Sequence, residues 1–210
     1  MKDFVILSDS CCDLNKEMRE RFGIDYVPMR IIYGETDIPA SLDWEQISFK
    51  QFYDMMRDGV RVKTAMITAD EFRDVFIKYL DEGKDVMYIA CSSALSNSYK
   101  SSLMAHDILA KERPDGKIIC IDSLNACMGL GMICMTASDL RAQGNSIEEV
   151  AAYIEEHKLE VNQFATVESL NYLKRAGRVS TTSAVFGGLL QVKPIIISDA
   201  IGQNVAIEKV

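Results

Sequence analysis

Positive charge is scarce in this sequence, which holds 23 lysine and arginine residues against 31 aspartate and glutamate residues. The resulting net charge of -8 leaves no basic field that could neutralise the phosphates of a nucleic acid or bind an acidic membrane surface. Long apolar runs are missing as well, because none reaches the roughly 18 residues that a membrane-spanning helix needs. We therefore expect neither nucleic acid as a partner nor stable membrane insertion.

Histidine is equally rare, since the chain holds only His106 and His157. A serine hydrolase needs a base beside its nucleophile, and both histidines fall within expected helices, away from the serine-rich turns. The six cysteines form no Cys-x-x-Cys pair, so the sequence predicts neither a zinc site nor a disulfide framework, and buried, reduced thiols are favoured. Because the chain passes directly into a strand pattern without a secretory leader, we expect a cytoplasmic protein.

Short apolar runs alternate with amphipathic helical patterns over residues 1–160. This alternation predicts an α/β domain in which helices lie on both faces of a parallel sheet. Within it, one strand is expected over Tyr26–Tyr33, while Lys63–Met66 is interpreted as a loop. The pattern changes near residue 160, and residues 161–210 are expected to begin a second α/β domain that is incomplete, because the last strand pattern is cut off.

Polar residues mark where the helices should begin. A serine or threonine followed three residues later by glutamate forms a capping box, in which each side chain bonds the backbone N–H of the other residue. Such positions bound helices more sharply than hydrophobic periodicity does. The predicted capping residues are Asp13 or Asn15, Ser48, Thr68 with Glu71, and Ser146 with Glu149.

Three expected strands end in serine or aspartate, at Ser8-Asp9-Ser10, at Ser92-Ser93 and at Asp122-Ser123. In a parallel sheet these turns meet at one edge, where ligands of such folds bind. Serine and aspartate are also common turn formers and helix caps, which would explain any single turn. The three turns hold no lysine or arginine, and the chain has no G-x-x-x-x-G-K-[ST] loop, so a carboxylate ligand is favoured over a phosphate and no cofactor is predicted.

Two other features allow more than one interpretation. Methionines clustered over Met128–Met135 could line an adaptable apolar tunnel, although core filling is the commoner role. The basic cluster Lys174–Arg178 suits a helix C-terminus that ends at Gly177, and it suits an exposed anion or partner contact equally well.

Several short segments of this chain also occur in a characteristic order and spacing. They are Ser8-Asp9-Ser10 with Asp13-Leu14, Lys63-Thr64, Ser92-Ser93-Ala94-Leu95-Ser96-Asn97-Ser98-Tyr99, Asp122-Ser123 through Gly129 and Gly131, Leu170-Asn171-Tyr172-Leu173-Lys174-Arg175-Ala176-Gly177-Arg178-Val179-Ser180, and Lys193-Pro194-Ile195-Ile196. Together they resemble the motifs of the DegV family, the fatty-acid-binding proteins that serve bacterial fatty acid kinase. The resemblance covers essentially the whole chain.

The resemblance implies a two-domain α/β protein that holds one long-chain fatty acid between its domains, and the shortage of metal-ligating residues in the chain leaves no metal site predicted. By position, the implied carboxylate ligands are the hydroxyls of Thr64 and Ser93 and the backbone N–H groups around Ser96 and Asn97. Asn97 stands where the family usually has glycine, and asparagine tolerates a left-handed backbone, so the turn is expected to be kept. Family members also continue past Val210 and supply a C-terminal histidine to the carboxylate.

The function predicted from these features is that of a non-catalytic carrier, which presents the carboxylate to a separate fatty acid kinase subunit for acyl phosphate formation. Arg175 and Arg178 match a basic motif suited to the head group or to that kinase. Two other functions stay open at this point. One is a serine-based or dihydroxyacetone-kinase-like enzyme, which needs a histidine or lysine within reach of Ser93, and the other is a regulatory module built on the basic cluster.

Overall fold

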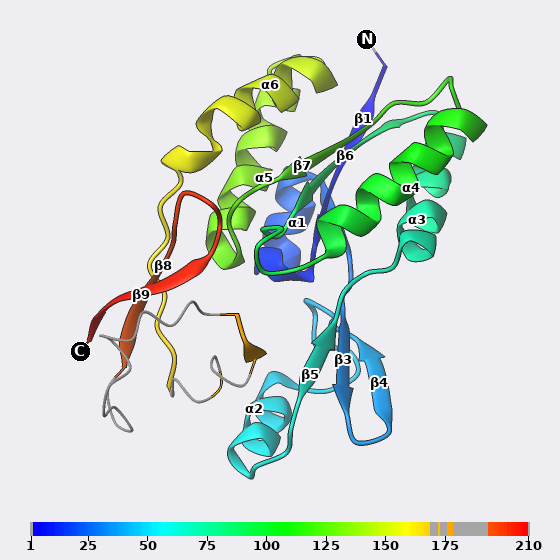
Figure 1. The fold of residues 1–210 in the computed structure, drawn as a ribbon. Coiled ribbons are helices and arrows are strands. Elements are labelled where there is room, and N and C mark those ends of the chain that lie inside the picture. The colour runs from blue at the N-terminus through cyan, green and yellow to red at the C-terminus, as the bar shows by residue number, and fades with distance from the viewer. Residues whose placement is uncertain (1, 169–171, 173–175, 179–192, 210) are drawn as a thin grey trace.

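A four-stranded parallel sheet forms the centre of the computed structural model, which describes residues 2–168, 172, 176–178 and 193–209. The strand order is β2-β1-β6-β7, and all three pairings are parallel (Figure 1). The predicted α/β class is therefore confirmed. The strands are β1 (Phe4–Asp9), β2 (Ile24–Val27), β6 (Asp85–Ala90) and β7 (Ile118–Asp122).

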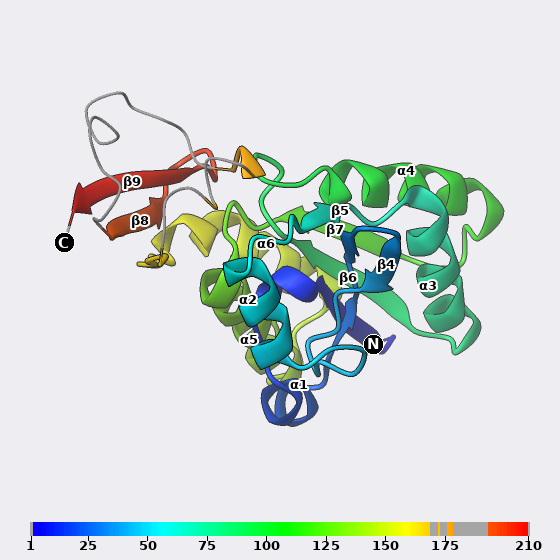
Figure 2. The ribbon, with the colours of Figure 1, turned by 90° about the horizontal axis from the view of Figure 1, so that it is seen from below.

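Helices cover both faces of this sheet, as predicted (Figures 1 and 2). On one face lie α3 (Ala69–Asp81) and α4 (Ser98–Glu112), which also pack against each other. On the other face lie α5 (Cys127–Ala142) and α6 (Ile147–His157), with α1 (Lys16–Phe22) beside β2 and α5. Two short 3-10 helices, η1 (Ser10–Cys12) and η2 (Lys158–Glu160), follow β1 and α6.

Burial on both faces of the sheet explains why the sequences of the central strands are uninterrupted apolar runs. All six residues of β6 are buried, because a strand inside a parallel sheet is covered by helices on both faces. Tyr88 packs on Phe72 of α3 with ring centroids 4.7 Å apart. On the opposite face α5 approaches η1 so closely that a Cβ on Gly131 would lie 2.5 Å from the carbonyl oxygen of Cys12.

The capping residues lie largely where the sequence predicts them. Capping boxes begin α3 at Thr68 and α6 at Ser146, and Ser48 caps α2 (Phe49–Arg57) in the same way. Of the two candidates for α1, Asn15 is the cap, since its side chain accepts the N–H of Met18 at 2.9 Å. Asp13 instead has a left-handed backbone, with φ 53°, where the chain leaves η1.

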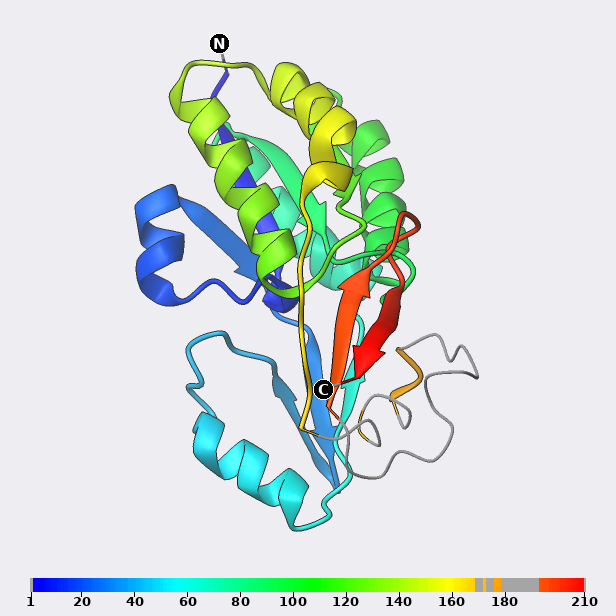
Figure 3. The ribbon, with the colours of Figure 1, turned by 90° about the vertical axis from the view of Figure 1, so that its left-hand side faces the viewer.

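A smaller antiparallel sheet extends beyond the carboxyl ends of the parallel strands, and two expectations were wrong there (Figures 1 and 3). Its strands are β3 (Arg30–Tyr33), β4 (Thr36–Pro39) and β5 (Lys63–Ala65). Tyr26–Tyr33 is not one strand, because Pro28 has no N–H to donate and the N–H of Met29 goes to Ser10 Oγ at 3.0 Å. Lys63–Met66 is not a loop throughout, since β5 pairs with the middle strand β3.

The described part of the chain after residue 160 is built around an antiparallel hairpin of β8 (Pro194–Ser198) and β9 (Asn204–Lys209). Ala165 pairs with Ile196, which attaches the preceding extended segment to the hairpin. The sequence also predicts a helix over Ser169–Arg175 and an apolar segment over Ala184–Val192, and these stretches fall mostly or wholly outside the described residues. A domain boundary near residue 160 stays a prediction. Among the described helices, none combines the length and the apolar character needed to cross a bilayer.

Candidate functional site

The structure brings the three serine and aspartate turns to one edge of the parallel sheet. They follow β1, β6 and β7, which are adjacent strands that run in the same direction. The smaller sheet faces this edge, so residues of β5 and of the first turn of α4 border the same region (Figure 1). The hydrogen bonds at each turn show which groups hold the fold together and which are left for a ligand.

Asp9 is a structural acid at the centre of this edge. Its side chain is fully buried, and its carboxylate accepts the Tyr88 hydroxyl at 3.0 Å, the Cys91 N–H at 2.8 Å and the Cys11 N–H at 2.9 Å. Burial raises the pKa of Asp9, while the two backbone N–H donors oppose that rise. Asp9 therefore ties the end of β1 to the end of β6 and has little capacity left for a ligand.

The serines on either side of Asp9 are also used within the fold. The Ser8 hydroxyl donates to the carbonyl of Ile89 at 3.0 Å, across the β1–β6 pair. The Ser10 hydroxyl accepts the N–H of Met29 at 3.0 Å, which fixes the start of the smaller sheet. All three residues of this turn therefore use their side chains to hold the strands of the site together.

Asp122 and Ser123 have a similar supporting function at the end of β7. One carboxylate oxygen of Asp122 accepts the N–H groups of Ser93 and Leu124, both at 3.1 Å. The Ser123 hydroxyl accepts the N–H of Asn125 at 3.0 Å and donates to the carbonyl of that residue. Asp122 consequently fixes the backbone of the serine turn at Ser93.

Most backbone N–H groups of the serine turn after β6 donate to acceptors within the same turn. The carbonyl of Ser92 accepts the N–H groups of Leu95 at 2.9 Å and Ser96 at 3.0 Å. The Ser92 hydroxyl accepts the N–H of Ala94 at 3.2 Å. With the Ser93 N–H held by Asp122, the N–H groups of these four consecutive residues all have partners inside the protein.

This arrangement corrects two expectations about the turn. The N–H of Ser96 is not left for a ligand, and its hydroxyl pairs with that of Ser98 at 3.0 Å. Asn97 does not use the left-handed backbone that its side chain would tolerate, because its φ is -79° and its ψ is 4°. Among the described residues, the N–H of Asn97 has no acceptor, so it is the backbone donor of this turn that stays available.

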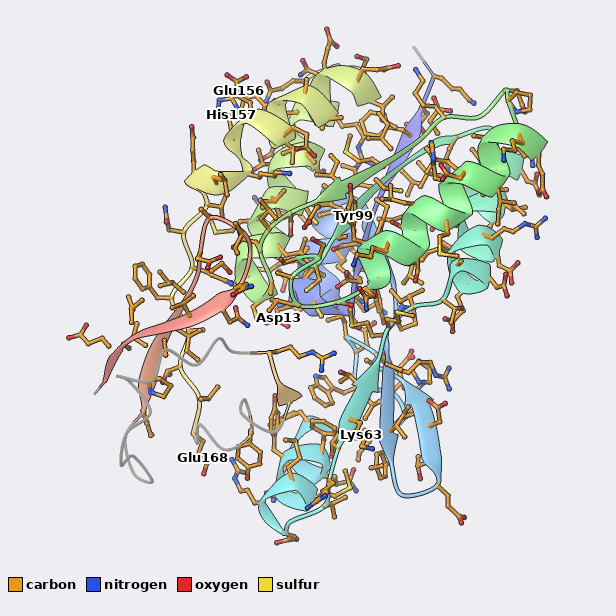
Figure 4. All side chains as sticks on the ribbon, viewed as in Figure 1. Asp13, Lys63, Tyr99, Glu156, His157 and Glu168 are labelled. Carbon is orange, nitrogen blue, oxygen red and sulfur yellow. The ribbon has the colours of Figure 1, made fainter. Side chains whose placement is uncertain are left out.

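The two predicted hydroxyl ligands lie on different elements, Ser93 in the turn after β6 and Thr64 on β5 of the smaller sheet. Ser93 is half-buried and Thr64 on β5 is exposed, and within the described part of the chain neither hydroxyl makes a hydrogen bond. The segment that follows Thr64 is attached to α4, where the N–H of Ile67 donates to Ser98 Oγ at 3.2 Å. Figure 4 shows the neighbouring residue Lys63 on β5 and Tyr99 at the start of α4.

One arginine of the basic cluster also reaches the serine turn. The Arg178 guanidinium donates to the carbonyl of Leu95 at 3.3 Å and to the carbonyl of Ala176 at 2.7 Å. Because this side chain is exposed, it places a positive charge at the rim of the serine turn. Arg175 lies outside the described residues.

Sequence reasoning missed two residues that support this site. Gly202, at the buried tip of the β8–β9 hairpin, packs so tightly that a Cβ there would overlap Ser92 Oγ and lie 3.0 Å from Leu124 Cα. The Lys158 ammonium donates to the carbonyl of Asp122 at 2.8 Å, and its side chain is only 12% exposed. Both contacts join distant parts of the chain, so neither has a local signal.

In the part of the chain that the structure describes, neither histidine forms a hydrogen bond with the serine turn. His106 pairs with its neighbour Asp107 on the exposed side of α4. His157 stacks on Tyr153 at the end of α6, with ring centroids 4.0 Å apart. Among the described residues, Ser93 thus has no histidine or lysine at hydrogen-bond distance, and the arrangement suits the binding of a small anion better than the activation of a nucleophile.

Comparison with known proteins agrees with the resemblance in the motifs. The model of the uncharacterised protein family DegV matches residues 3–210. A DegV domain-containing protein of Clostridium perfringens is 37% identical over 201 residues, which make up 95% of this chain and 69% of that protein.

Solved structures give the same result. A stearic-acid-binding protein of Eubacterium ventriosum matches with a TM-score of 0.88 and 29% identity, covering 99% of this chain and 70% of that one. A fatty-acid-binding DegV family protein of Thermus thermophilus matches with a TM-score of 0.85 and 28% identity, covering 100% of this chain and 71% of that one. The Fak B3 protein of Streptococcus pneumoniae fatty acid kinase, solved with linoleic acid, is 23% identical with a TM-score of 0.81 and covers 99% of this chain and 72% of that one, which shows a shared fold.

Proposed function

This chain belongs to the DegV family, and from that premise we propose that it binds one long-chain fatty acid and acts as a carrier without chemistry of its own. Two solved relatives above one quarter identity bind fatty acids, one of them stearic acid. The observation in this chain that supports the proposal lies at the serine turn, where the Ser93 hydroxyl and the Asn97 N–H have no partner among the described residues and the Arg178 guanidinium bonds the carbonyl of Leu95. A carboxylate is the anion that fits such a set of mostly neutral donors.

In this proposal the carboxylate is bound by the Thr64 and Ser93 hydroxyls and by the N–H of Asn97. Ser96 contributes through the shape of the turn, because its own N–H is used by Ser92. Arg178 lies close enough to the turn to balance the negative charge, since it bonds the carbonyl of Leu95. The remaining serines and aspartates of the three turns keep these donors in position.

The acyl tail supplies most of the binding free energy. Burying a CH₂ group contributes about 0.8 kcal/mol, so a chain of about sixteen carbons gives roughly 10 kcal/mol before the entropic cost of binding is subtracted. The hydroxyls at the head group contribute about 1 kcal/mol each. We therefore expect the head-group residues to determine orientation, and the apolar side chains to determine affinity.

We further propose that a separate ATP-dependent kinase subunit receives the carboxylate and forms the acyl phosphate. Arg178 supports this step, because it is exposed at the rim of the site and can contact a partner as well as the ligand. Arg175 is assigned to the same contact surface by the family motif. We also propose a cytoplasmic location, where the six cysteines, all free in the structure, stay reduced.

Mass spectrometry of lipid extracted from the purified protein tests the first proposal. We expect one fatty acid per chain in the wild type and in the control Thr136→Val, whose hydroxyl bonds the carbonyl of Met132 on α5. The double variant Thr64→Val with Ser93→Ala should keep the lipid with an affinity within about thirtyfold of the wild type, because the loss is confined to two head-group hydroxyls of about 1 kcal/mol each.

A second measurement tests the head-group assignment. With the kinase subunit and ATP, the double variant Thr64→Val with Ser93→Ala should form little acyl phosphate, while Thr136→Val should match the wild type. Unchanged acyl phosphate formation by the double variant would refute the assignment of Thr64 and Ser93. Hydrolysis of acyl esters that depends on Ser93 alone would instead favour a serine-based enzyme.

A further inference from the structure

A group of sulfur atoms lies directly behind the serine turn and takes no part in the site described above. One potential ligand atom each from Asp9, Cys11 and Cys91 falls within 4.8 Å of the other two. Cys11 Sγ also lies 3.5 Å from Met29 Sδ. We propose that Cys11, Cys91 and Met29 bind one thiophilic monovalent cation, Cu(I), through their three sulfur atoms.

The three sulfur donors are held in place by the backbone contacts of this edge. The Asp9 carboxylate accepts the N–H of Cys11 at 2.9 Å and the N–H of Cys91 at 2.8 Å, so one buried group positions both cysteines. The N–H of Met29 is fixed by Ser10 Oγ at 3.0 Å. A metal site of this kind needs little rearrangement, because its ligands lie next to strand ends rather than on long loops.

The chemistry of the donors selects the cation. Two thiols and a thioether are soft ligands, which favour Cu(I) over hard cations such as Mg²⁺ and Ca²⁺. Zinc is disfavoured because its structural sites have four ligands, usually cysteine and histidine, and thioethers are not among them. Asp9 cannot easily complete a zinc site, since its two oxygens already accept three hydrogen bonds.

Burial leaves one route to the sulfur atoms. Cys91 is 3% exposed and Met29 is 7% exposed, whereas Cys11 is half-buried. The cation therefore enters on the side of Cys11. On binding, the two S–H bonds break, their protons pass to water, and two Cu–S(thiolate) bonds and one Cu–S(thioether) bond form without any change of oxidation state.

A third thiol nearby provides a matched control. Cys127, at the start of α5, is exposed, and its sulfur is not among the ligand atoms that lie within 4.8 Å of one another. A second control is Cys120, which is half-buried like Cys11 but lies on β7, whereas Cys11 lies in η1.

The test is an anaerobic titration of the reduced, full-length protein with Cu(I) in competition with a coloured Cu(I) chelator. We expect one Cu(I) per chain with the ultraviolet charge-transfer absorption of a Cu–thiolate bond. Cys11→Ser and Cys91→Ser should each weaken binding by about 100-fold, and Met29→Leu by about tenfold. Cys127→Ser and Cys120→Ser should bind like the wild type.

Three results would overturn the proposal. Competition in which the protein removes no Cu(I) from the chelator would exclude a site, and binding that survives in Cys11→Ser or Cys91→Ser would place it elsewhere. Zinc that binds as tightly as Cu(I) in the same competition would contradict the selection by soft donors. Unchanged thermal unfolding of each variant in the absence of metal is required for the comparison, and Cys11→Ala and Cys91→Ala replace any serine variant that is destabilised.

Discussion

Replacing Gly202 with alanine tests whether the β8–β9 hairpin supports the serine turn. Gly202 has a φ of +76° and is buried at the hairpin tip, where a new Cβ would lie 3.0 Å from Leu124 Cα and 3.1 Å from Ser92 Cβ and would overlap the Ser92 hydroxyl. The hydroxyl cannot simply rotate away, because it accepts the N–H of Ala94. The hairpin tip must therefore move away from the turn, or the turn must deform.

A matched variant separates the two causes of the stability loss expected for Gly202→Ala, which are backbone strain and overpacking. Gly83 has nearly the same backbone, with φ +78°, but a Cβ there would meet nothing within 4 Å. The free energy of unfolding of Gly83→Ala should therefore fall only by the cost of a left-handed alanine, about 1–2 kcal/mol. The free energy of unfolding of Gly202→Ala should fall by the same amount plus the cost of overpacking, about 1–3 kcal/mol.

Two assays measure this difference. Urea unfolding of both variants gives the change in the free energy of unfolding, and displacement of a fluorescent fatty acid gives the change in ligand affinity. We expect Gly202→Ala to be the less stable variant and also to bind the ligand more weakly, because Ser92 organises the donors of the turn. Equal free energies of unfolding for the two variants would refute the packing argument, and wild-type affinity in Gly202→Ala would show that the hairpin does not support the ligand site.

Three more variants test separate parts of the structure. Asp122→Ala leaves the Ser93 N–H without its acceptor, so fatty acid affinity measured by the same displacement assay should fall by about tenfold, and an unchanged affinity would contradict the positioning role. Burial raises the pKa of the Cys12 thiol from 9.0 to about 11, so the folded state favours the protonated thiol. The resulting contribution to the free energy of unfolding is complete below pH 9 and is lost as pH rises towards 11. That loss amounts to about 2–3 kcal/mol, and urea unfolding across this pH range should show a smaller decline for Cys12→Ala than for the wild type. Asn15→Ala removes the cap of α1 and should lower the free energy of unfolding by about 1 kcal/mol, visible as a lower melting temperature, whereas no change would mean that the cap is dispensable.

Much of the fold follows from local patterns in the sequence. The strand at Val86–Ala90 reads as buried because every residue is apolar, and the capping boxes at Thr68 and Ser146 mark helix starts without any knowledge of tertiary contacts. The meeting of the three turns follows from the parallel order of the strands. These features depend on residues that are close in sequence, or on a general rule of parallel sheets.

The parts that could not be predicted depend on contacts between distant segments. Strand β5 has only three residues and exists because it pairs with β3, so its own composition gives no strand signal. The sequence identifies Ser93 and Ser96 as donors of a turn, but it does not show that Asp122 and Ser92 already use their N–H groups. Which hydroxyl of a serine-rich turn is left for a ligand is settled only by the three-dimensional partners of its neighbours.

The detour of the chain through the smaller sheet has a practical consequence. It leaves the parallel sheet after β2, at Met29, and ends at Ile67, just before α3, and each of these junctions is anchored by a serine hydroxyl. Its far tip at Gly34 and Glu35 is an open hairpin bend with empty space around the glycine. A fluorophore or short peptide inserted at this tip should be tolerated, and, because Thr64 lies on β5 of the same sheet, we expect it to report on the proposed ligand loading without altering the proposed donors.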